Sequence, residues 1–159
     1  MEDTKYVNGV KKLGQRVKTI RTALALPVMV NEITDLLLRR TLDRFDREID
    51  PDYVPWEPLA DSTLARRRRD GVKSTKKLNR TGAMRGAIKR IRGAAAGLLV
   101  TNTGAGARIG VADPAQTKKA AAQQYGTRFI PQRKFLGIGS LDVKSVDSLL
   151  RRKAKSLTE

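Results

Sequence analysis

Residues 28–49, VMVNEITDLLLRRTLDRFDREI, decide the fold that we expect for this chain. Their apolar side chains recur every three or four residues, the spacing that gathers them on one side of a helix. This stripe consists of Ile33, Leu37, Leu38, Leu42, Phe45 and Ile49. Charged residues occupy the other sides, and Pro27 suits the first position of a helix. The stretch therefore predicts one long helix over residues 28–49 that buries its apolar side.

A second apolar stripe precedes this helix. It consists of Val7, Val10, Leu13, Val17, Ile20 and Leu24. The spacing predicts a helix over residues 6–26, although Gly9 and Gly14 each cost about 1 kcal/mol relative to alanine. This segment is either the first helix of the domain or an arm that packs on a neighbouring subunit. We divide the chain accordingly into residues 1–27, the helical arm or first helix, and residues 28–159, a single domain.

Downstream of the long helix, residues 50–59 contain three prolines, which exclude a continued helix and predict an extended segment. Two short basic helices are expected after it. Asp61 or Ser62 is predicted to cap the first of them, which carries Arg66–Arg69 and gives way to a polar loop over residues 71–79.

The second short helix is predicted to be capped by Thr81. Its inward side carries the apolar residues Met84, Ala87, Ile88 and Ile91. Its outward side carries the basic residues Arg85, Lys89, Arg90 and Arg92. Both short helices would thus present positive charge to their surroundings.

The remaining residues change from a helical to a strand pattern and back. Leu98 and Val100, then Ile109 and Val111, flank a glycine-containing stretch, which predicts an antiparallel hairpin. We expect an alanine-rich helix over residues 115–125 that ends at Gly126, an irregular segment over 127–139, and a final helix capped by Ser145. That helix carries Val146, Leu149, Leu150 and Leu157 on one side. The predicted fold class is α+β, with helices outnumbering strands.

The composition excludes several kinds of chemistry. The chain has 159 residues, no Cys and no His, so disulfides, thiolate metal sites and the commonest general base are absent. Gly104, Gly106 and Gly110 lack the spacing and the following Lys-Ser/Thr of a phosphate loop, and they lie within the predicted hairpin. The acidic residues show no pairing typical of a hydrolytic or metal site. We expect no enzymatic activity and no cofactor.

No apolar run is long enough for a membrane span, and the start of the chain does not resemble a signal peptide, so we expect synthesis in the cytosol and no membrane partner. Trp56, the one tryptophan, stands between prolines, where an anchor onto the domain's own core is the expected role.

The charge is large and uneven. Thirty-three Lys and Arg against sixteen Asp and Glu give +17. Residues 28–60 carry a net negative charge, whereas residues 61–96 hold the largest positive excess. The Arg66–Arg69 run is compatible with a solvated helix side, an acidic protein partner or nucleic acid, and at least one of its stems is expected to pack locally because consecutive helical residues point about 100° apart. The opposed charges also allow one copy's basic block to meet the next copy's acidic helix.

Several short motifs, in order, resemble those of one protein family. They are Trp56-Glu57-Pro58-Leu59, Thr63-Leu64-Ala65-Arg66, Leu78-Asn79-Arg80-Thr81-Gly82, Gln124-Tyr125-Gly126 and Ile130-Pro131-Gln132-Arg133-Lys134-Phe135-Leu136-Gly137. Together with the long helix they resemble the virion morphogenesis, or tail completion, proteins of tailed bacteriophages over roughly residues 36–150. Two positions depart from the family pattern, Lys134 where proline is frequent and Gln123 where histidine is frequent.

The resemblance implies a structural virion protein at the head-tail junction, or neck. Copies would form a ring, with six favoured and twelve possible, that completes the tail or joins it to the portal-connector complex and the tail tube. Assembly would take place in the host cytoplasm, and phage DNA passing through the ring is a possible non-specific contact. The alternative is a free basic nucleic-acid-binding protein.

Under this resemblance, two sets of residues are candidate sites. The structural anchors are Trp56, Pro58, Leu59, Tyr125, Gly126, Pro131, Phe135, Leu136 and Gly137. The residues expected to face a partner, DNA or another subunit are Arg66, Arg67, Arg68, Arg69, Lys76, Lys77, Arg80, Arg85, Lys89, Arg90 and Arg92.

Overall fold

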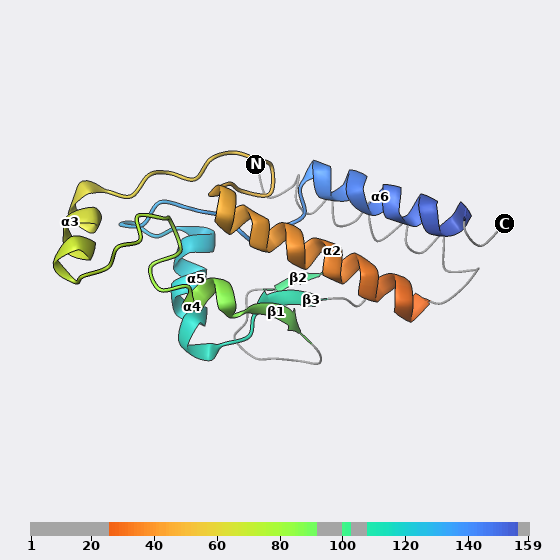
Figure 1. The fold of residues 1–159 in the computed structure, drawn as a ribbon, viewed down its shortest axis with the longest axis horizontal. Coiled ribbons are helices and arrows are strands. Elements are labelled where there is room, and N and C mark those ends of the chain that lie inside the picture. Colours follow the sequence, from red (N-terminus) through yellow and green to blue (C-terminus); the bar gives the residue numbers. More distant parts are fainter. Residues whose placement is uncertain (1–25, 92–99, 103–107, 156–159) are drawn as a thin grey trace.

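A computed structural model describes residues 26–91, 100–102 and 108–155 of the chain (Figure 1). The described elements are helices and a small antiparallel sheet, which confirms the α+β class. Several predictions lie outside the described residues: the helix over residues 6–26 up to Ala25, and the placements of Arg92, Leu98, Gly104, Gly106 and Leu157.

Helix α2 spans Leu26–Arg47 and confirms the long predicted helix to within two residues at each end. Pro27 lies in its first turn, where a missing backbone N–H removes no helical hydrogen bond. The buried side includes Ile33, Leu37 and Phe45, none more than 3% exposed. Thr41 is also buried there, and its hydroxyl donates to the Leu37 carbonyl at 2.9 Å, so this polar group keeps a partner inside the core.

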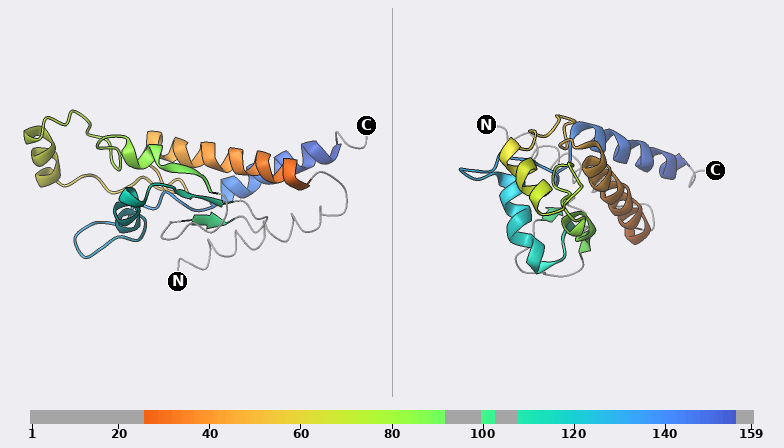
Figure 2. Two further views of the ribbon diagram at one scale, coloured as in Figure 1. Left: turned by 90° about the horizontal axis from the view of Figure 1, so that it is seen from below. Right: turned by 60° about the vertical axis from the view of Figure 1, so that its left-hand side comes forward.

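The chain after α2 turns back and becomes extended, as the prolines predicted. The turn contains positive φ values at Glu48 and Tyr53, and the Asp50 carboxylate accepts the backbone N–H of Asp52 and of Val54. Helix α3, Asp61–Arg69, follows the extended segment and lies at one end of the molecule in Figures 1 and 2. Its N-cap is Ala60, so the predicted side-chain cap from Asp61 or Ser62 is wrong.

The second short basic helix was predicted to extend through Ile91, which is wrong. Helix α4 covers only Ala83–Gly86, its N-cap is Gly82 instead of Thr81, and strand β1 covers Ile88–Ile91. Ile88 and Ile91 are buried three residues apart, which imitates a helical spacing. They form a strand because β1 pairs with β3, and such pairing is decided by the partner strand rather than by local spacing.

The predicted hairpin is confirmed and gains a third strand. Strands β2, Val100–Asn102, and β3, Arg108–Val111, are antiparallel, and the sheet has the order β1-β3-β2. The register places Ile88 opposite Val111 and Val100 opposite Gly110. Helix α2 contacts β1 and β3, and α6 lies beside α2 away from the sheet (Figures 1 and 2).

The two last helices differ in how well the sequence predicted them. Helix α5, Pro114–Tyr125, starts at the cap Asp113, whose carboxylate accepts the Ala115 N–H at 2.9 Å, and ends at Gly126 as expected. Helix α6 covers Ser140–Lys155, so the predicted cap at Ser145 is wrong. Ser145 lies inside the helix and its hydroxyl donates to the Leu141 carbonyl.

Three aromatic rings from distant segments occupy the centre of the core. Phe45 of α2 meets Trp56 and Phe135 edge to face, with ring centroids 5.5 and 5.2 Å apart. Such pairs contribute about 0.5–1.5 kcal/mol beyond the burial of their area. The core therefore joins α2, the extended segment and the chain after α5.

Candidate functional site

The first and last sequence motifs meet at the aromatic core. Trp56 is 4% exposed, and its indole Nε1 donates to the carbonyl of Lys134 at 2.8 Å. This hydrogen bond joins the first motif to the last across 78 positions of the sequence. Phe135 and Leu136, next in the chain, are buried beside it.

Arg133 ties the same two motifs together a second time. Its side chain is buried, Nε donates to the carbonyl of Glu57, and Nη2 donates to the carbonyl of Pro58, each at 2.9 Å. Nη1 donates to Oε1 of Gln123 on α5 at 3.1 Å. Burial lowers the pKa of Arg133 from its ordinary value, and the nearby Glu57 carboxylate opposes this shift. The guanidinium thus holds the extended segment against α5.

Gln124 joins the fourth motif to the fifth. Its Oε1 accepts the backbone N–H of Phe135 and of Leu136, and its Nε2 donates to the Leu136 carbonyl. Gly126 then has φ +74°, and a Cβ there would lie 3.2 Å from the Gln132 backbone nitrogen. A glycine at this turn lets the chain fold back against α5.

These contacts shape a groove of about 920 Å³, which we call the motif groove. Its lining comes from the segment 57–60, α3, residues 78–84, α5 and residues 129–133. Residues from four of the five motifs line it. They are Glu57, Pro58, Leu59, Thr63, Leu78, Arg80, Thr81, Gly82, Ile130, Pro131 and Arg133.

Some predicted anchors lie at the surface instead of in the core. Tyr125 is 67% exposed, so it does not act as a core anchor. Pro58 and Pro131 are exposed and Leu59 is half-buried, all three in the wall of the motif groove. Gly137 is partly exposed with φ +150°. The sequence could not separate core from groove residues because both kinds are apolar.

Phe129 was not among the predicted site residues. It lines the motif groove and is 85% exposed, the most exposed of the large apolar residues that the structure describes. The guanidinium of Arg128 stacks over its ring, 5.5 Å from the centroid. Large exposed aromatic side chains beside a groove are typical of protein interaction surfaces. The sequence signal that could have pointed to Phe129 is its position directly before Ile130, the first residue of the fifth motif.

The Arg66–Arg69 run is divided by the helix. Arg67 is buried, and its Nη1 donates to the carbonyls of Ser74 and Lys76 at 2.9 and 2.8 Å. Burial, and next to it the charge of Arg80, lowers the pKa of Arg67 from its ordinary value. Arg67 therefore does not face a partner, which confirms that one stem packs locally. Arg66, Arg68 and Arg69 are exposed. Arg66 forms a long ion pair with Asp70, with 3.9 Å between Nε and Oδ2.

The rest of the basic block largely meets acids of its own chain. Arg85 pairs with Asp46 at 2.8 Å and Arg90 with Asp35 at 2.7 Å, both acids of α2. Lys77 pairs with Glu48, Lys76 donates to the Asp46 carbonyl, and Arg80 pairs with Asp70; Lys89 remains exposed. The acidic and basic segments thus compensate much of each other's charge within one copy.

A buried ion pair that the sequence did not reveal holds α2 to the start of α6. Arg44, 3% exposed, donates to Asp142, which is fully buried, and also to the carbonyls of Phe135 and Gly137. Arg40 donates to the other carboxylate oxygen of Asp142. Burial lowers the pKa of Arg44 from its ordinary value, and Asp142 opposes that shift. The sequence signal for this ion pair is the position of Asp142, an acid in the first turn of the otherwise basic helix α6.

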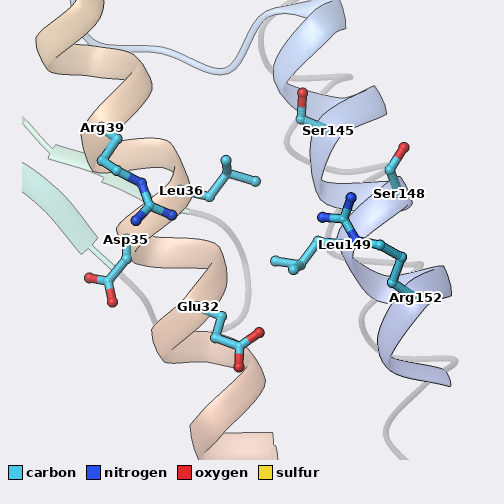
Figure 3. A pocket seen from close by; sticks show the side chains of 8 residues that line it. All are labelled: Glu32, Asp35, Leu36, Arg39, Ser145, Ser148, Leu149 and Arg152. Atoms are coloured by element: carbon cyan, nitrogen blue, oxygen red, sulfur yellow. The ribbon is translucent and has the colours of Figure 1, made fainter. Parts of the chain in front are cut away.

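A second groove, of about 530 Å³, separates α2 from α6. Figure 3 shows Leu36 of α2 and Leu149 of α6 pointing toward each other, with charged side chains around them. The charges are balanced, because Glu32 and Asp35 accompany two arginines. This lining favours neither a positively nor a negatively charged ligand, so the motif groove is the stronger candidate for a binding site.

The described residues offer no catalytic centre that we can recognise. Within those residues, no group of three or more acids could hold a metal ion. None of the described helices combines the length and the apolar character needed to cross a bilayer.

A family model described as the phage virion morphogenesis family matches residues 7–155, which is nearly the whole chain. No curated protein and no solved structure matches the chain.

Proposed function

Since the chain belongs to the phage virion morphogenesis family, we propose that it is a structural neck protein that completes the tail or joins it to the portal-connector complex. The observation that carries the proposal is the motif groove. Residues of four of the five motifs line one recess, which also carries the exposed Phe129. Such an arrangement suits binding in an assembly rather than catalysis.

The proposed assembly is a ring of copies at the head-tail junction, with six copies favoured by the symmetry of a tail and twelve as the portal-matched alternative. A modest core supports this, because subunits that are weakly stabilised alone gain stability from their neighbours. Contacts that repeat head to tail around an axis close into such a ring. The protein would be in the host cytoplasm during assembly and in the neck of the finished virion.

A second candidate is direct contact with nucleic acid, either as a free binding protein or with DNA passing through the ring. The exposed Arg66, Arg68 and Arg69 of α3 support it, since α3 lies at one end of the molecule (Figure 1). Contacts of this kind would be non-specific and would weaken steeply with salt.

The neck role can be tested with a phage in which a nonsense mutation blocks synthesis of this chain. Under the proposal, electron microscopy shows heads and tails that fail to join or tails of abnormal end structure, and the chain supplied in trans restores joining. Native mass spectrometry of the purified chain with tails gives the number of copies. Normal, infectious particles without the chain would refute the neck role.

A further inference from the structure

We propose that the motif groove binds an acidic, amphipathic segment of a different protein of the particle, with an apolar side chain beside Phe129 and carboxylates over Lys118 and Lys119. This inference rests on the proposed function, because it names the partner chemistry of the same groove.

The apolar part of the groove requires a protein segment. Phe129 and Ile130 at one end, and Ala122 on the α5 wall, give it an apolar lining. Phe129 leaves 85% of its surface uncovered, and burying an aromatic side chain of this kind is a typical source of binding energy at interfaces. A duplex DNA backbone would leave such residues without a partner.

The charge of the groove requires that this segment be acidic. Lys118 and Lys119 project from α5 into the lining and are exposed, and neither makes an ion pair with any described residue. Arg67 and Arg133 lie in the same lining with their guanidinium groups directed to carbonyl or amide oxygens. Glu57 is the one acid that lines the groove. Carboxylates of a partner would compensate this positive excess.

We infer a different protein as the partner, because most of the acids in the described part of this chain are already engaged. Most carboxylates that the structure describes pair with the chain's own cations or accept its own backbone N–H groups. These are Glu32, Asp35, Asp43, Asp46, Glu48, Asp50, Asp70, Asp113, Asp142 and Asp147. A second copy that docked an acidic surface here would have to break its own ion pairs.

The test uses the purified full chain and a fluorescent peptide of about four helical turns. Leu and Phe occupy one side of this peptide and Glu fills the rest; a control peptide has Gln in place of every Glu. Binding is followed by fluorescence anisotropy at about 0.1 M salt, where charges are screened beyond about 10 Å. The Glu peptide is expected to bind at least about tenfold more tightly than the Gln peptide, as steering by complementary charge predicts.

The variants locate the binding. K118E/K119E is expected to weaken the Glu peptide at least about tenfold, and Phe129→Ser also weakens it. The matched control is K144E/R152E, which reverses two exposed cations on α6 and changes the net charge equally; it is expected to stay within about twofold. The emission of Trp56, the one tryptophan, checks that each variant is folded.

Three outcomes would overturn the inference. Equal losses in the two double variants would show that the peptide senses only net charge. Tighter binding of a duplex DNA oligonucleotide, lost in K118E/K119E, would make nucleic acid the occupant. Self-association of the chain that disappears in K118E/K119E would make the occupant a second copy. Each can occur while the chain is still found in virions and required for joining, so this inference and the neck function fail separately.

Discussion

Arg44 and Asp142 form an ion pair across 98 positions of the sequence, buried between the end of α2 and the start of α6. The backbone N–H of Gly139 donates to the same carboxylate at 2.8 Å, and the Arg44 guanidinium also donates to the Gly137 carbonyl. One carboxylate and one guanidinium thereby organise the loop that leads into α6. In the sequence, this loop comes shortly after residues 129–133, which line the motif groove.

The first prediction concerns this pair. Asp142→Asn keeps the shape of the side chain but leaves the buried Arg44 charge without its counter-charge, so the free energy of unfolding should fall by about 3 kcal/mol or more. Urea unfolding followed by Trp56 fluorescence measures the change.

The matched control is Asp43→Asn, which removes an acid from the exposed pair with Arg47 and is expected to cost less than about 1 kcal/mol. Joint replacement R44M/D142L should recover part of the lost stability, because the buried Arg44 charge is removed together with its partner and only the partly exposed Arg40 loses a counter-charge. Similar losses for Asp142→Asn and Asp43→Asn would show that the buried pair has no special role.

The second prediction concerns Gly139. A Cβ at this position would lie 1.9 Å from the carbonyl oxygen of Pro51, so Gly139→Ala must displace the backbone. We expect a loss of at least about 2 kcal/mol, as for overpacked cores, which corresponds to a lower Tm by roughly 4–8 °C at this chain length. Gly86→Ala is the control, because a Cβ at Gly86 meets nothing within 4 Å. A tolerated Gly139→Ala would contradict the close approach of the two loops.

The third prediction separates Arg67 from its neighbours in the run. Arg67→Ala leaves the carbonyls of Ser74 and Lys76 without their donor and should cost about 1–3 kcal/mol of stability. R68A/R69A should change stability by less than about 0.5 kcal/mol per residue, because both side chains are exposed. If the chain binds duplex DNA, R68A/R69A should also lower the slope of log affinity against log salt by roughly two. Equal stability of the two variants would contradict the buried position of Arg67.

The fourth prediction concerns Arg133. Arg133→Lys keeps the charge but loses the fork that reaches the carbonyls of Glu57 and Pro58 together. Hydrogen exchange should therefore become faster at the two protected amides beside this contact, the Trp56 N–H, which donates to the Glu48 carbonyl, and the N–H of residue 133, which donates to the Gln123 carbonyl. The stability loss should be about 1–3 kcal/mol. Arg128→Lys serves as the control, since Arg128 is exposed and stacks only on Phe129. Unchanged exchange at these two amides would show that Arg133 does not hold the segment 57–60 in place.

The sequence predicted those elements whose signals are local. Helix α2 follows from a long apolar stripe, and α5 follows from an alanine-rich segment that ends at Gly126. The extended segment follows from its prolines, which cannot supply helical hydrogen bonds. The order of the motifs predicted the family, and the model of that family matches residues 7–155.

The candidate site could be predicted only in part. The motifs named many residues of the motif groove, but they did not show that Trp56 and Phe135 are core residues while Tyr125 and Phe129 are exposed. Aromatic residues carry the same local signal in both places. Which of them is buried depends on what packs against it, which is a property of distant segments.

The sequence by itself determined the long amphipathic helix, the extended proline segment, the absence of cysteine and histidine chemistry and the strong positive charge. The tertiary structure alone decided that Ile88–Ile91 is a strand, because β3 lies beside it. It also decided that Arg67 and Arg44 are buried and that acids of α2 neutralise Arg85 and Arg90. Local spacing fixes which side of an element is apolar, whereas burial, strand pairing and charge compensation depend on residues that only the folded chain brings together.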